Sequence, residues 1–127
     1  MILLDTSFMV RALQRGSPED RSLRAWVRAG ETLGMSTVAW GQFLCGPVSA
    51  AQIQIVAELI EEPIPFGLDE SATAARFFNE TGRRRGSFAD CMIAATAFEA
   101  GAPIATTDVA DFRRFERLGV RVLSLEK

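Results

Sequence analysis

Three aspartates in this sequence have the residue type and placement needed to hold a cation. Asp5 directly follows the apolar run Ile2-Leu3-Leu4, Asp90 lies near the start of an apolar segment, and Asp108 follows a second short apolar run. Carboxylates that lie close together repel one another unless a cation neutralises them. Oxygen ligands alone favour Mg²⁺ or Mn²⁺. We therefore predict that Asp5, Asp90 and Asp108 are metal ligands of one site.

Each of these acids also has a purely structural alternative. An aspartate in front of a helix, such as Asp5, can cap it and stabilise it by about 1 kcal/mol. Ser87 followed by Asp90 resembles a capping box, and Asp111 is expected to cap a short helix. For Asp90 the metal interpretation is favoured, because it is the only charge before Glu99 on an otherwise apolar helix, and a buried carboxylate normally needs a partner.

The residues that are missing restrict the chemistry further. The chain contains no histidine, and its only lysine is Lys127. Histidine acid-base catalysis, Ser-His-Asp triads, histidine zinc ligands and a P-loop lysine are therefore excluded. The formal net charge is −2 and the sequence pI is about 5.2, so any contact with nucleic acid must come from a local group of arginines.

Short apolar segments alternate with segments of helical periodicity along the chain. The expected strands are 2–4, 32–37, 63–66, 103–106 and 120–123, and the expected helices are 6–14, 17–30, 38–45, 48–61, 69–80, 87–100 and 111–117. This alternation predicts a three-layer α/β/α fold with a central, mostly parallel sheet of four to five strands, in one domain over residues 1–127. Ligands of such sheets bind beyond the carboxyl ends of the strands, which is where Asp5 and Asp108 are expected.

Two further expectations concern burial and location. The helix that Ser17 is expected to cap, with Pro18 at its first position, should bury Leu23, Trp26 and Val27. The sequence has no run of eighteen apolar residues and no signal-peptide pattern at its start, so we expect a cytoplasmic protein without a membrane partner. Its two cysteines lie in apolar runs and are expected to be free.

Three segments resemble signature blocks of PIN-domain proteins of the VapC-like ribonuclease toxin type. They are Leu3 to Ser7, Asp90 to Ala97 and Thr106 to Phe112, in the family's order and spacing. The resemblance implies a homodimer that cleaves single-stranded or looped RNA with Mg²⁺ or Mn²⁺, and a small antitoxin partner. It implies metal ligation by Asp5 and Asp90, completed by Asp108, with Asp111 as an alternative or indirect ligand. The hydroxyls of Thr6, Ser7 and Thr107 are expected to orient waters or ligands. Arg84 and Arg85 are expected to bind the RNA backbone.

A fourth segment, Met35 to Gly46, departs from the family pattern at one position. The corresponding block usually has a glutamate where this sequence has Gln42. An amide oxygen can ligate weakly or accept from a bound water, but it carries no charge, so cation binding should be weaker. Two hypotheses follow. In the first, the protein is a metal-dependent endoribonuclease of attenuated activity that acts as the toxin of a toxin-antitoxin pair. In the second, it is a degenerate PIN module that binds RNA or a partner without cleaving.

Other classes with an aspartate after the first strand fit less well. A receiver domain needs an internal lysine, and an aspartyl-phosphate phosphatase needs a second acid where Ser7 stands. A dinucleotide-binding fold needs a glycine-rich loop after the first strand, and none is present there.

Overall fold

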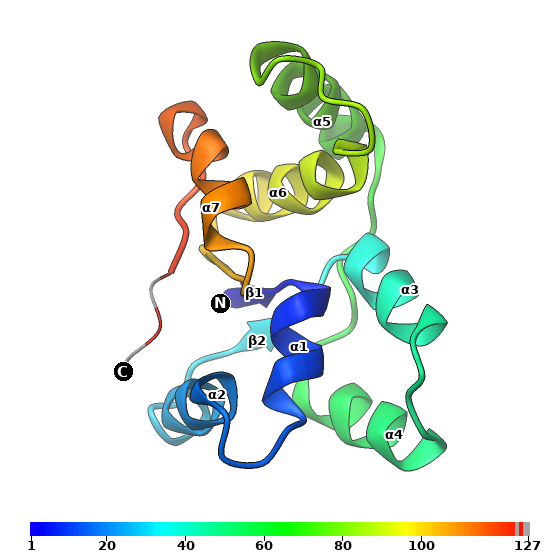
Figure 1. Ribbon diagram of the computed structural model, residues 1–127, viewed down its shortest axis with the longest axis vertical. Coiled ribbons are helices and arrows are strands. Elements are labelled where there is room, and N and C mark those ends of the chain that lie inside the picture. Colours follow the sequence, from blue (N-terminus) through cyan, green and yellow to red (C-terminus); the bar gives the residue numbers. More distant parts are fainter. Residues whose placement is uncertain (124, 126–127) are drawn as a thin grey trace.

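The computed structural model describes residues 1–123 and 125 of the chain (Figure 1). Its centre is a three-stranded parallel sheet in the order β2-β1-β3. The strands are β1 Ile2–Leu4, β2 Leu33–Gly34 and β3 Ile104–Ala105. Leu3 of β1 pairs with Gly34 on one side and with Ile104 on the other. All of β1 is buried, because helices cover both faces of the sheet.

Helices occupy most of the remaining chain. They are α1 Thr6–Ala12, α2 Pro18–Arg28, α3 Thr37–Cys45, α4 Ala50–Leu59, α5 Leu68–Glu80, α6 Phe88–Ala100 and α7 Val109–Phe112, followed by the 3-10 helix η1 Arg113–Leu118. In Figure 1, α5, α6 and α7 lie on one side of the sheet, and α1, α2 and α4 lie on the other. The expected α/β fold with a parallel sheet between helices is confirmed.

The two outermost predicted strands are reduced to single bridges that extend the sheet on each side. Ile64 pairs in parallel with Ser36, and Val122 pairs in parallel with Ile104. Pro63 and Pro65 flank Ile64 and lack the backbone N–H that a longer ladder would require. The sheet therefore has three strands, with bridges where a fourth and fifth were expected.

Several local expectations are confirmed, and others are corrected. Ser17 caps α2 by accepting from the backbone N–H of Asp20. Ser87 makes no such cap, because its hydroxyl donates to the Arg84 carbonyl instead. Asp108, rather than Asp111, stands at the start of α7, and its side chain makes no capping hydrogen bond.

The core surrounds α6, as its apolar sequence predicts. Cys91 and all of residues 93–97 are buried there. On α2, Leu23 is buried and Trp26 packs against the core, but Val27 is 47% exposed, so the expectation that Val27 is buried is wrong. Both cysteines are free. Within the described residues, no helix is long and apolar enough to cross a membrane.

Candidate metal centre

One cavity of about 440 Å³ lies beyond the carboxyl ends of β1 and β3. Residues from four places in the sequence line it, namely Asp5, Thr6, Ser7, Gln42, Cys45, Asp90 and Asp108. Asp5 follows β1, Asp90 lies in the first turn of α6, and Asp108 follows β3. The parallel sheet brings these positions together, because its strand ends meet at one edge.

Asp5 is the most enclosed of the three acids, with 4% of its surface exposed. Its Oδ1 accepts from the backbone N–H of Thr6 at 2.8 Å, so it caps α1. Its Oδ2 accepts from the hydroxyls of Ser7 at 3.0 Å and Thr106 at 2.8 Å. Burial raises the pKa of Asp5 despite these hydrogen bonds, and the charge of Asp108 adds to the rise. Capping leaves acceptor capacity on Oδ1 for a further ligand.

Thr106 is a site residue that the sequence analysis missed. Its side chain is buried, donates to Asp5 and accepts from the backbone N–H of Asp108 at 3.0 Å. It therefore joins two of the acids across the sheet. Thr107, which was expected to contribute its hydroxyl, instead donates its backbone N–H to Ser7 Oγ at 3.3 Å. Only the path of the chain after β3 distinguishes these adjacent threonines.

Asp90, in the first turn of α6, is half-buried in the lining of the same cavity. Burial raises its pKa first, and the neighbouring carboxylates of Asp5, Asp108 and Asp111 raise it further, while Arg114 acts in the opposite direction. Because Ser87 forms no side-chain cap, Asp90 does not belong to a capping box. The interaction of Asp90 with Asp5 and Asp108 shows the mutual repulsion that a bound cation would relieve.

Gln42 projects into the same cavity from α3. The hydroxyl oxygen of Thr6 lies 3.0 Å from Gln42 Oε1 and 3.0 Å from the Ala39 carbonyl oxygen. One hydroxyl proton serves these two acceptors, so the contact with Gln42 is shared. The amide thus stands beside the acids but contributes no negative charge to them.

The remaining predicted residues lie outside the cavity lining. Asp111 and Arg84 are both exposed and form an ion pair with 3.8 Å between Arg84 Nη2 and Asp111 Oδ1. Arg85 is exposed in the turn before α6. Arg114 is mostly buried, with its Nη2 3.8 Å from Asp90 Oδ2. No sequence signal distinguished it from its neighbours.

The chemistry of the lining fits a hard divalent cation, because its charged donors are carboxylate oxygens. In their present positions, no three His, Cys, Asp or Glu side chains among the described residues are close enough to hold one ion. Ligation by all three acids therefore requires side-chain rotation. Asp90 and Asp108 have the freedom to rotate, since neither accepts a side-chain hydrogen bond from a described residue at this site, whereas Asp5 is fixed by three donors.

Comparison with known proteins is consistent with this geometry. The PIN domain family model matches residues 2–118, and the chain belongs to the PIN domain family. It is 30% identical to Ribonuclease VapC1 from Rickettsia felis, an alignment that covers 97% of this chain and 96% of the relative. The resemblance found in the three sequence blocks is thereby confirmed.

Solved structures with the same fold include complexes of the VapBC type. VapBC2 from Rickettsia felis, bound to a DNA fragment from its promoter, matches with a TM-score of 0.80 and 17% identity over 99% of this chain and 100% of that chain. VapBC-5 from Mycobacterium tuberculosis, a member of the VapBC family of toxin-antitoxin systems, matches with a TM-score of 0.63 and 23% identity over 94% and 97%. At these identities the likeness concerns the fold.

Proposed function

We propose that this protein is a metal-dependent endoribonuclease that hydrolyses RNA phosphodiester bonds with Mg²⁺ or Mn²⁺. The observation that carries the proposal is the buried Asp5 with Asp90 and Asp108 around one cavity at the carboxyl edge of the sheet. The name of the Rickettsia felis relative, a ribonuclease, supports the choice of RNA as substrate. The chain has no histidine that could act as an alternative acid-base group.

Some residues of the site are proposed to hold the cation, and others orient the carboxylate of Asp5. A cation held by Asp5, Asp90 and Asp108 would activate water and stabilise charge on the scissile phosphate. Thr106 and Ser7 fix the Asp5 carboxylate through their hydroxyls, so Asp5 is positioned before any ligand arrives.

The RNA backbone is proposed to lie along the exposed turn ahead of α6. Arg84 and Arg85 lie there, and both are exposed. Planar guanidinium groups suit bidentate contacts to phosphate.

The test is cleavage of a structured RNA by the purified protein with Mg²⁺ or Mn²⁺, compared with the same reaction after chelation. Cleavage that requires the cation supports the proposal. RNA binding without cleavage under all conditions supports the second candidate, a degenerate PIN module, which the neutral side chain of Gln42 favours.

Stabilisation by Mn²⁺ is expected to increase with pH. The pKa values of Asp5 and Asp90 are raised in the folded state, so without a cation their contribution to stability falls as pH rises from the ordinary aspartate range through the raised values. Mn²⁺ binds the ionised forms and protons compete with it. We expect the rise in melting temperature to be small near pH 5 and large near pH 8, where the gain in unfolding free energy reaches about 3 kcal/mol at a hundredfold excess over Kd.

Thermal unfolding with and without Mn²⁺ across this pH range measures the effect. Asp90→Asn should reduce the gain, whereas Asp69→Asn, which changes an exposed acid in the first turn of α5, should leave it unchanged. A gain that is independent of pH would show that Mn²⁺ binds elsewhere.

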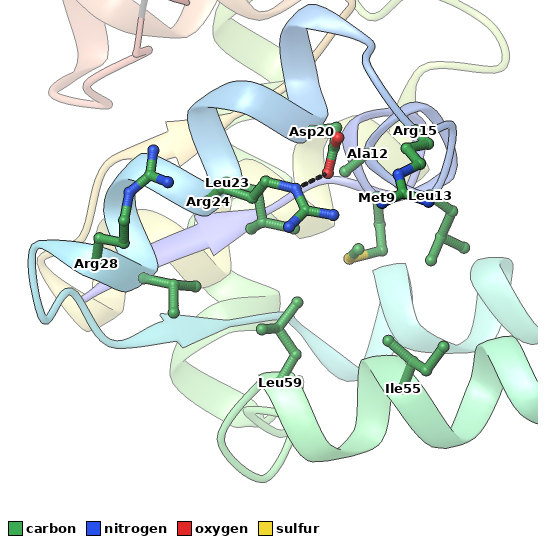
Figure 2. A pocket seen from close by; sticks show the side chains of 11 residues that line it. Met9, Ala12, Leu13, Arg15, Asp20, Leu23, Arg24, Arg28, Ile55 and Leu59 are labelled. Atoms are coloured by element: carbon green, nitrogen blue, oxygen red, sulfur yellow. Dashed lines mark hydrogen bonds and ion pairs between the residues drawn. The ribbon is translucent and has the colours of Figure 1, made fainter.

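A groove on another face suits the proposed antitoxin partner. A cavity of about 520 Å³ lies between α1, α2 and α4, and Figure 2 shows the side chains that line it. Apolar side chains form most of its lining, namely Met9, Ala12, Leu13, Leu23, Val27, Ile55 and Leu59. Arg15, Arg24 and Arg28 also line it, and Asp20 is the only acid among the described residues of this lining. We propose that an apolar helix face of the antitoxin binds here with acidic residues beside it.

Ile55→Asp is expected to weaken binding of that partner by about ten- to a hundredfold, since a buried apolar contact in a protein interface carries much of the affinity. Ile55 is 54% exposed in the chain itself, so the fold should tolerate the change. Calorimetry with the protein encoded beside this chain measures the affinity. The exposed Leu68, outside the groove, provides the control Leu68→Asp. Equal effects of both substitutions would contradict the assignment of the groove.

Homodimer formation, cytoplasmic location and the extent of the domain stay predictions from the sequence. Size-exclusion chromatography with light scattering would measure the oligomeric state directly.

A further inference from the structure

Arg114 differs from the other arginines that form ion pairs in the described part of the chain. Its side chain is 15% exposed, compared with 60% for the adjacent Arg113. The guanidinium carbon lies 4.4 Å from the centre of the Phe115 ring, which is fully buried. The Arg114 side chain is therefore packed against the protein core instead of extending into solvent.

Much of the hydrogen-bonding capacity of this guanidinium is unused. Nη1 donates to the Asp111 carbonyl at 2.7 Å. Nε and Nη2 are buried and have no hydrogen-bond partner among the described residues. Nη2 lies 3.8 Å from Asp90 Oδ2, which is close enough for an ion pair but too long for a hydrogen bond. Buried donors without partners are unfavourable, so a small rotation of Asp90 toward Arg114 would be stabilising.

Asp90 is thus placed between two kinds of partner. The carboxylates of Asp5 and Asp108 act on it from the cavity side, the exposed Asp111 acts on it from outside the cavity lining, and Arg114 is the neighbouring cation that opposes all three. The charge that Arg114 supplies is the one that a divalent cation in the cavity would also supply. Because like charges repel, the positive charge of Arg114 opposes binding of the cation in the cavity.

We infer that Arg114 is a positioning residue that competes with the divalent cation for Asp90 and so weakens cation binding. The inference rests on the proposed function, because it takes Asp90 as a metal ligand. Rotation of Asp90 toward Arg114 would give Nη2 a hydrogen-bond partner, and rotation into the cavity would complete the acidic set with Asp5 and Asp108. Cation affinity then depends on the difference in free energy between these two positions of the Asp90 side chain.

The test is calorimetric titration of Mn²⁺ into the full chain and into Arg114→Met, which removes the charge while keeping an apolar stem against Phe115. We expect Mn²⁺ to bind Arg114→Met about tenfold more tightly, the size expected for one screened neighbouring charge. Arg114→Lys, which keeps the charge, should bind Mn²⁺ nearly as the wild type does. Arg113→Met makes the same change in net charge at an exposed position and should have little effect.

The outcomes separate this inference from the proposed function. Equal or weaker binding to Arg114→Met, or equal tightening by Arg113→Met, overturns the competition. If the wild-type chain binds no Mn²⁺, the proposed metal-dependent function fails and the inference fails with it. Should Arg114→Met unfold, Arg114→Gln replaces it, and the same tightening is expected.

Discussion

Asp90→Asn is expected to reduce cation-dependent RNA cleavage by about a hundred- to a thousandfold while the fold remains intact. The substitution removes one of the charged ligands proposed for the cation and leaves an amide of similar size. Loss of several kcal/mol of charge stabilisation corresponds to a rate effect of this order. Initial rates with a structured RNA, measured at limiting and at saturating Mn²⁺, determine the effect.

The same variant should be neutral or more stable when no cation is added. Burial and the charges of Asp5 and Asp108 raise the pKa of Asp90, so the folded state disfavours its ionised form at neutral pH. Ser87 makes no capping hydrogen bond, and no capping box is lost.

Asp69→Asn is the matched control, because Asp69 is exposed and lies outside the cavity lining. A marked loss of stability in Asp90→Asn, or cleavage at the wild-type rate, would favour a structural role for Asp90.

Gln42→Glu should raise cation-dependent cleavage by about ten- to a hundredfold. Glutamate is nearly isosteric with glutamine, and one carboxylate oxygen can accept from the Thr6 hydroxyl as Gln42 Oε1 does now. The other oxygen would add a negative charge to the cavity that Asp5, Asp90 and Asp108 share. One charge within several ångströms of a divalent ion is worth on the order of 1–3 kcal/mol after screening.

The dependence of the gain on Asp90 is the decisive control. Adding Asp90→Asn to Gln42→Glu should abolish it, and Gln14→Glu, which adds the same charge at an exposed position outside the cavity, should change nothing. Flat activity of Gln42→Glu at low and at saturating cation would show that position 42 does not act on the site. Cleavage by the variant alone, with none by the natural sequence, would establish the degenerate module.

Local sequence patterns were sufficient to predict the helices, the central strands and the edge of the sheet where the acids lie. Alternating apolar strands and helices predicted the parallel sheet, and an aspartate directly after a strand predicted the positions of Asp5 and Asp108. These predictions work because strand burial, helix capping and the common edge of parallel strands follow from residues close in sequence. The lone charge on an otherwise apolar helix predicted Asp90 for the same site, and the PIN-type block then predicted Gln42.

Contacts between distant residues were decided only by the tertiary structure. Thr106 meets Asp5 across 101 positions of sequence, and nothing local favours it over Thr107. Arg114 has the same residue type as the exposed Arg113, and only the tertiary structure places it beside Asp90. Val27 has the spacing of a core residue but lines a groove. Residue type and periodicity determine which face of an element is apolar, whereas the packing of elements determines what that face meets.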